Sequence, residues 1–243
     1  MNRLWTFGCS FTEEFISVPR EGCTRWEYID KFFNGTPPET WVTILANQLG
    51  YEPMNRGAMS GWPHEGNCND GIFNNICHYS NQFKKGDMVI VEWTFLERFK
   101  WVNVEHSKMT TVLAKQYCEG ASDSTMDETI VNKSHYLWVN ELFVKQKMLQ
   151  TLADNIGFDL YYWSVEGTYY KTKFDEIKNN KQYLLSDNFT KHQLERFVIG
   201  RVYDNRGMNI TDETKGIIQD SHLAKSGHEV LGNLFYKDII ERR

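Results

Sequence analysis

Short runs of apolar residues alternate with amphipathic stretches along most of this chain. The run at Met88–Trp93 is rich in β-branched residues and predicts a buried strand. Stretches with apolar positions three and four residues apart predict helices. In chain order we expect a strand at Leu4–Phe7, a helix at Trp41–Leu49, a strand at Tyr51–Asn55, a helix at Ile72–Gln82, a strand at Met88–Trp93, a helix at His135–Ile156, a strand at Phe158–Trp163 and a helix at Gly227–Ile240.

Glycine, proline and polar residues mark the ends of these elements. Thr40 stands in the N-cap position before the second element, and Gly50 and Gly157 follow the last residues of two helices. The segment from about residue 18 to 40 is rich in glycine and proline and predicts a long surface loop. A further short helix is expected near residues 192–197.

The order of elements indicates the fold class. Strands that alternate with helices form βαβ units, so we expect an α/β fold with a parallel sheet covered by helices on both faces. No repeat or linker divides the chain, and a single domain over residues 1–243 follows. Two irregular stretches, about 94–134 and 164–216, are expected as insertions at the carboxyl end of the sheet, where ligands bind in such folds.

Composition narrows the function classes. The 243 residues include 27 Lys and Arg against 32 Asp and Glu, and no basic run stands out, which disfavours a nucleic-acid partner. No apolar stretch approaches the roughly 20 residues of a membrane helix, and no signal-peptide pattern begins the sequence. Five cysteines without a CxxC pair fit a reducing compartment. We therefore expect a cytoplasmic or virion-associated protein without a membrane partner.

The first chemical candidate is Ser10, which directly follows the first expected strand in the segment Phe7–Thr12. A serine at a strand-to-helix turn carries its hydroxyl at the carboxyl end of the sheet. There it can act as a nucleophile, with backbone N–H groups of the following turn as oxyanion donors. The alternative is that Ser10 only caps a helix.

The second candidate is the pair Asp220 and His222, just before the last expected helix. An aspartate can hold a nearby histidine in one tautomer, so that the imidazole acts as a general base toward a serine hydroxyl. The alternative is that both are polar loop residues and that His228 helps the last helix to begin. A metal site of Asp220, His222 and His228 is a weaker alternative, because these residues lack a fixed helical spacing.

Glycines also gather after the second expected strand, where Gly61 and Gly66 precede Asn69. Such a loop brings backbone N–H groups close to a ligand, and an ordinary surface loop is the alternative. The chain contains no GxSxG, P-loop, GxGxxG or HExxH motif. The usual α/β-hydrolase, nucleotide-phosphate, dinucleotide and zincin interpretations therefore fall away.

Taken together, these segments resemble the SGNH/GDSL hydrolase family across nearly the whole chain. Gly8-Cys9-Ser10 is similar to its first block, and Asn55 followed by Gly61 or Gly66 to its second. Asp220-Ser221-His222-Leu223 is similar to its last block. The resemblance implies a flavodoxin-like three-layer α/β/α sandwich without cofactor or metal.

The resemblance also implies site roles. Ser10 would be the nucleophile, His222 the general base and Asp220 the residue that orients it. The Ser10 backbone N–H, a loop glycine (Gly61 or Gly66) and a side chain would hold the oxyanion. Asn69 and Thr94 are the candidates for that side chain.

The chain departs from the family pattern in three places. Cys9 replaces the usual aspartate, and Asp220 and His222 are separated by one residue rather than two, as in some phage-encoded and polysaccharide-modifying members. The third block, Gly-x-Asn-Asp, is missing. The sequence at the matching strand end is Val91–Arg98 instead. Losing one oxyanion donor typically costs about 10²–10³ in rate, so weak or lost activity is an open alternative.

The leading hypothesis is a serine ester hydrolase that forms an acyl-enzyme on Ser10. Aromatic residues around 93–101 and 163–170 suit sugar stacking, which favours a carbohydrate O-acetyl esterase, unless they pack in the core. A second hypothesis is a carbohydrate-binding or virion-associated protein that kept the fold and lost turnover. A metal-assisted hydrolase is the third.

Overall fold

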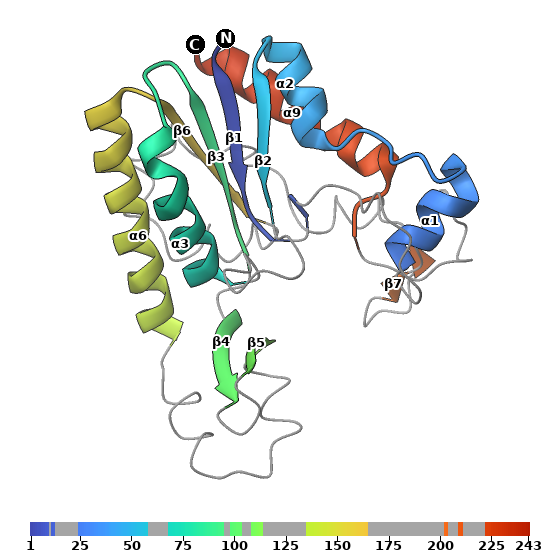
Figure 1. Ribbon diagram of the computed structural model, residues 1–243, viewed down its shortest axis with the longest axis horizontal. Coiled ribbons are helices and arrows are strands. Elements are labelled where there is room, and N and C mark those ends of the chain that lie inside the picture. Colours follow the sequence, from blue (N-terminus) through green and yellow to red (C-terminus); the bar gives the residue numbers. More distant parts are fainter. Residues whose placement is uncertain are drawn as a thin grey trace.

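The computed structural model describes residues 1–9, 11–12, 24–57, 68–94, 98–103, 108–113, 135–164, 202–203, 209–210 and 222–243. Its centre is a parallel sheet with strand order β2-β1-β3-β6 (Figure 1). These strands are β1 (Arg3–Phe7), β2 (Glu52–Arg56), β3 (Met88–Trp93) and β6 (Asp159–Ser164). The expectation of an α/β fold with a parallel sheet is confirmed.

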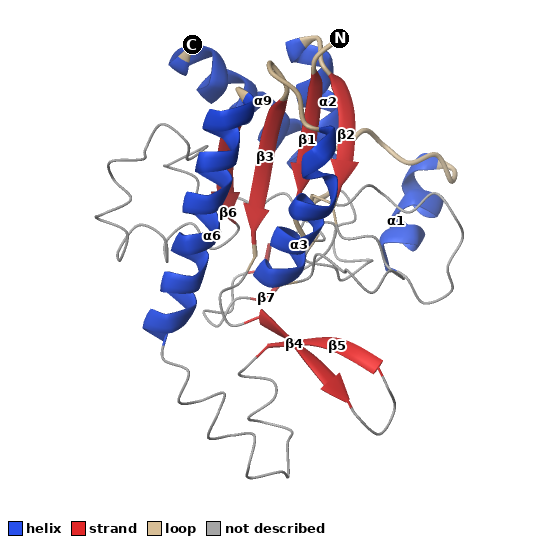
Figure 2. Cartoon of the chain, turned by 60° about the vertical axis from the view of Figure 1, so that its left-hand side comes forward, coloured by secondary structure: helices blue, strands red, loops and turns tan. Residues whose placement is uncertain are grey.

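Helices cover both faces of this sheet (Figures 1 and 2). On one face lie α2 (Trp41–Leu49) and α9 (Lys225–Arg242), and on the other lie α3 (Asn69–Tyr79) and α6 (His135–Ile156). A single 3-10 turn, η1 (Ser80–Gln82), extends α3. The predicted helix at 72–82 thus begins three residues earlier and has a 3-10 end.

Strand β3 supplies both layers of the core, because successive side chains of a strand point to opposite faces. Its residues Met88 and Ile90 pack with α2 and α9, whereas Val89 and Val91 pack with α3 and α6. All six β3 residues are buried, as expected for the inner strand of a parallel sheet. The apolar run in the sequence therefore marks the centre of the molecule.

Three segments differ from the sequence-based expectation. Helix α1 (Thr24–Phe33) lies inside the predicted long loop, and its Tyr28 and Ile29 are buried against Ala224. An antiparallel hairpin, β4 (Arg98–Asn103) and β5 (Lys108–Leu113), forms in the first predicted irregular stretch. A second pair of short strands, β7 (Val202–Tyr203) and β8 (Asn209–Ile210), lies in the other. The helix expected near 192–197 lies outside the described residues.

The strand order reverses at β1, because β2 lies on one side of it and β3 on the other. In open α/β sheets, ligands bind outside the carboxyl ends of the strands at such a switch point. Here this point lies between the carboxyl ends of β1 and β3. The segment that follows β1 contains Ser10.

Candidate active site

The turn after β1 is held from several sides. The Thr12 backbone N–H donates to the Cys9 carbonyl at 3.0 Å and closes the turn. Two carbonyl oxygens further along the turn accept side-chain donors: Trp41 Nε1 donates to the Phe11 oxygen at 3.0 Å, and Asn55 Nδ2 to the Thr12 oxygen at 2.8 Å. Ser10 itself lies outside the described residues, but its neighbours Cys9 and Phe11 both take part in these hydrogen bonds.

A buried carboxylate forms the floor of this turn. Glu92, near the carboxyl end of β3, has no exposed surface. Its Oε2 accepts from the Cys9 backbone N–H at 3.1 Å and from the Thr12 hydroxyl at 2.5 Å. Its Oε1 accepts from the Cys9 thiol at 2.8 Å. Every one of these donors belongs to the turn around Ser10.

Gly8 lets β1 and β3 approach this closely. A Cβ at position 8 would lie 2.6 Å from the Cβ of Glu92 and in direct contact with the Thr12 hydroxyl. Real Cβ atoms do not come so near, so a larger residue would push the carboxylate away from the turn. The glycine is required here by close approach.

Asn55 connects the end of β2 to the same turn. Besides its donor bond to Thr12, its Oδ1 accepts from the Gly57 backbone N–H at 2.9 Å and from the Thr6 hydroxyl at 3.3 Å. One amide side chain therefore positions the turn after β1 and the start of the loop after β2. Gly61 and Gly66, the expected oxyanion donors of that loop, lie outside the described residues.

His222, the expected general base, lies beside this turn. Its ring centroid is 5.6 Å from that of Phe11, with 38° between the ring planes. Phe11 directly follows Ser10, so two segments more than 200 residues apart in sequence meet at the switch point. Asp220 lies outside the described residues.

The segment after His222 is seated on α1. The Tyr28 hydroxyl accepts from the Lys225 backbone N–H at 2.9 Å, at the first turn of α9. Ala224 is buried and packs against Tyr28 and Ile29. Helix α1, which the sequence did not predict, thus holds the residues that directly follow His222 in the chain.

Asn69 and Thr94, the two expected side-chain donors for the oxyanion, contact each other. Asn69 Oδ1 accepts from the Thr94 backbone N–H at 2.9 Å, and Asn69 Nδ2 donates to the Thr94 carbonyl at 3.3 Å. This pair joins the first residue of α3 to the residue after β3. Since an amide nitrogen carries two hydrogens, one of those on Asn69 remains for another acceptor.

His228 has a structural contact that bears on the metal alternative. Its Nδ1 accepts from the Trp41 backbone N–H at 3.2 Å and so caps the start of α2. Thr40 occupies the N-cap position but makes no side-chain cap bond, contrary to the expectation that it would cap this helix. Among the described residues, no three His, Cys, Asp or Glu side chains gather as metal ligands would.

Trp93 and Trp163, two of the aromatic residues considered for sugar stacking, are buried in the core. Trp93 stacks on Tyr162, and Trp163 packs edge-on against Trp41 and Phe235. For these two residues the core alternative is correct. Their neighbours at 95–101 and 165–170 have no described side chains.

Glu92 is the site residue that sequence reasoning missed. One signal was available, because a carboxylate interrupts the otherwise apolar run Met88–Trp93. A charged residue in a fully buried strand requires hydrogen-bonding partners, and those partners lie about 80 residues earlier in the chain.

Comparison of this chain with protein families, with curated proteins and with solved structures gave no match. The functional argument therefore rests on the residues and geometry of this chain. No helix among the described residues combines the length and apolar character needed to cross a membrane.

Proposed function

We propose that this protein is a serine ester hydrolase of the SGNH/GDSL type, with Ser10 as nucleophile and His222 as general base. One observation carries the proposal: His222 lies against Phe11, the neighbour of Ser10, at the switch point of a parallel sheet. A serine hydroxyl within reach of a histidine at that edge would meet the minimum requirement for an acyl-enzyme mechanism.

In the proposed reaction the Ser10 hydroxyl oxygen adds to the ester carbonyl carbon while His222 accepts the hydroxyl proton. The bond to the alcohol oxygen then breaks, and His222 returns the proton to the departing alcohol. The acyl group stays on Ser10 until water repeats the sequence and releases a carboxylic acid. Asp220 orients His222, and the Ser10 backbone N–H, Gly61 or Gly66, and Asn69 are the proposed oxyanion donors.

We expect acetyl esters of carbohydrates to be the preferred substrates. This part of the proposal rests on the aromatic residues whose side chains are not described, since Trp93 and Trp163 are buried in the core. A panel of acetylated sugars, simple aryl acetates and long-chain acyl esters tests it. Faster hydrolysis of the long-chain esters would contradict it.

The binding-protein alternative is favoured by one observation. Both functional ends of the Asn69 amide already contact the Thr94 backbone, so this side chain contributes to the fold whether or not it meets an oxyanion. In that alternative the protein binds its carbohydrate or virion partner and does not turn over esters.

Labelling with a fluorophosphonate probe separates the two. We expect wild-type protein to be labelled on Ser10, and labelling to be lost in Ser10→Ala and His222→Ala. Ser80→Ala and His78→Ala are matched controls, since these residues lie at the end of α3, and they should label like the wild type. Folded wild-type protein that does not react would overturn the hydrolase proposal.

A further inference from the structure

The proposed triad does not explain why the carboxylate of Glu92 is fully buried in strand β3. A carboxylate with no exposed surface loses its hydration, and this desolvation costs several kcal/mol unless hydrogen bonds replace the lost water. An apolar residue would continue the run of β3 at no such cost. The donors that offset this desolvation therefore indicate what Glu92 does.

Three donors among the described residues come from the turn around Ser10. Oε2 receives the backbone N–H of the residue before Ser10 and the hydroxyl of the residue two positions after it, at 3.1 and 2.5 Å. The thiol of Cys9 reaches Oε1 at 2.8 Å. One side chain of β3 thus accepts hydrogen bonds from the turn on both sides of Ser10.

We propose that Glu92 is a positioning residue that fixes the Ser10 hydroxyl for attack, acting through Cys9 and Thr12. This inference rests on the proposed hydrolase function. Glu92 is buried beneath Gly8 and works without touching the substrate. Charge-assisted hydrogen bonds are about twice as strong as neutral ones, so a carboxylate restrains the turn more tightly than an uncharged acceptor.

The restraint matters because nucleophilic attack is sensitive to placement. A displacement of about 1 Å at a reacting group can cost on the order of a hundredfold in rate. Trp41 and Asn55 hold the carbonyls of Phe11 and Thr12, whereas Glu92 holds the N–H of Cys9. Losing Glu92 should therefore free the start of the turn even while its end stays attached.

The opposite end of the same strand offers a matched control. Asp87, just before β3, is also a buried carboxylate, and it accepts from Arg3, Trp5 and Lys84. None of its partners belongs to the Ser10 turn. Asp87→Asn therefore reports what losing a buried carboxylate does to stability alone.

The experiment measures fluorophosphonate labelling as kinact and KI, alongside thermal unfolding, for Glu92→Met, Asp87→Asn and the wild type. Glu92→Met should lower kinact about tenfold to a hundredfold and leave KI unchanged, because the nucleophile is misplaced and not the probe pocket. Asp87→Asn should lower the unfolding temperature and leave kinact unchanged.

Two Thr12 variants keep the test decisive if Glu92→Met does not fold. Thr12→Val removes the hydroxyl that Glu92 accepts and should lower kinact, whereas Thr12→Ser keeps the hydroxyl and should restore it. A labelled wild type with unchanged kinact in Glu92→Met or in Thr12→Val overturns the role of Glu92 alone. A wild-type protein that is not labelled overturns the hydrolase proposal, and the positioning role of Glu92 falls with it.

Discussion

Asp87 shows how a single side chain secures the amino edge of the sheet. Its carboxylate accepts from Arg3 at 2.6 Å, from the indole of Trp5 at 3.1 Å and from the Lys84 backbone N–H at 3.1 Å. Burial by itself raises the pKa of this carboxyl, but the hydrogen bonds outweigh burial and leave the pKa below its ordinary value. The charged form is therefore the one that the fold stabilises.

The sign of the resulting pH dependence follows from linkage. Because the pKa of Asp87 is lower in the folded protein, the unfolded chain binds more protons. The stabilisation is complete above the unfolded value of about 3.9 and is lost as the pH falls through the folded pKa. We expect Asp87→Asn to lower the free energy of unfolding at pH 7 by about 3 kcal/mol, and by a smaller amount at pH 3.

Urea unfolding at the two pH values measures this difference. Glu27→Gln serves as the control, since Glu27 and Lys31 form an exposed pair on α1, and it should change stability by less than about 0.5 kcal/mol. An equal loss in Asp87→Asn at pH 7 and pH 3 would show that the Asp87 charge is not what stabilises the edge.

At this scale the sequence revealed residue types but not partners. The resemblance predicted that Ser10 and His222 meet, and this stays a prediction: His222 lies beside Phe11, but Ser10 is outside the described residues. Gly50 was expected to end α2 and does so with a left-handed φ of 70°. The cap at the other end of α2 comes from His228, 187 residues away, and no local pattern contains that contact.

Among the elements, α1 shows why local signals can mislead. Glycines and prolines flank it, and these predicted a loop across the whole segment. Yet Trp26, Ile29 and Phe33 follow the three-to-four spacing of a helix, and Ile29 with its neighbour Tyr28 buries against Ala224. The tertiary contact with the segment after His222 gives this short helix its place, and short helices generally depend on such packing.

The hydrogen bond that Tyr28 of this helix accepts from Lys225 can be tested by substitution. Tyr28→Phe removes the acceptor of the Lys225 N–H while keeping the ring in its cluster. An unsatisfied N–H at the start of α9 should loosen the segment that carries His222. We expect kinact for the fluorophosphonate probe to fall about threefold to tenfold, with little change in KI.

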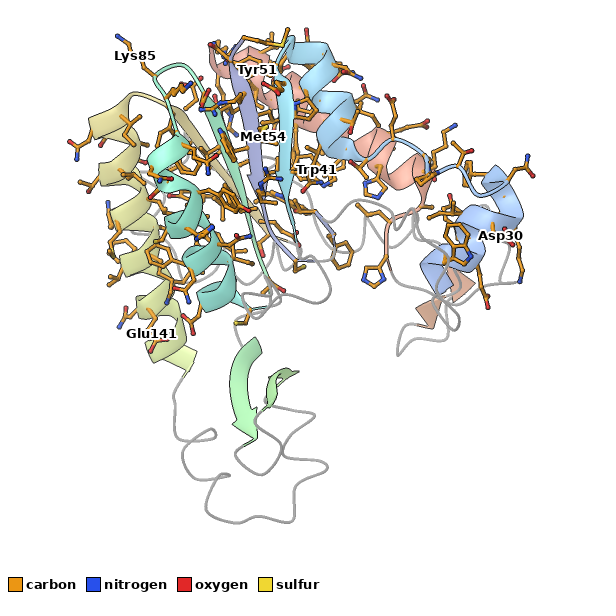
Figure 3. The ribbon with its side chains drawn as sticks, viewed as in Figure 1. Asp30, Trp41, Tyr51, Met54, Lys85 and Glu141 are labelled. Atoms are coloured by element: carbon orange, nitrogen blue, oxygen red, sulfur yellow. The ribbon has the colours of Figure 1, made fainter. Side chains whose placement is uncertain are left out.

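Tyr51→Phe is the matched control. The Tyr51 hydroxyl also accepts one hydrogen bond, from Arg243 at 3.0 Å, but it lies at the other end of the sheet (Figure 3). Figure 3 shows Trp41, in contrast, at the end of α2 that faces the carboxyl ends of the strands. Equal labelling rates in the two tyrosine variants would contradict a role of α1 in placing His222.

For the whole molecule, the alternating pattern predicted the parallel sheet and its two helical layers, because βαβ units have few ways to bury their apolar faces. The hairpin of β4 and β5 was not predicted, since polar and apolar residues alternate only over Arg98–Trp101 and not through Lys108–Leu113. That the chain forms one domain stays a prediction. The sharing of one sheet by two cores provides a test of it.

Neighbouring residues of β3 belong to different cores, so neither core should be able to melt alone. Ile90 packs with the α2 and α9 layer, and Ile76 of α3 packs on the other face. Ile90→Ala and Ile76→Ala should each lower the free energy of unfolding by about 2–5 kcal/mol, and the double variant by about the sum.

Both substitutions should shift one common transition. Among the described side chains, Trp41 and Trp163 are buried on one face and Trp5 and Trp93 on the other, so fluorescence reports both cores while far-UV circular dichroism reports the helices. Coincident curves in urea would indicate a single cooperative unit. A variant that splits the transition, with one step left at the wild-type midpoint, would mean that the two layers fold separately. The carboxyl ends of β1 and β3 would then not be held in register by a shared core, and the Ser10 turn would depend on Glu92 still more.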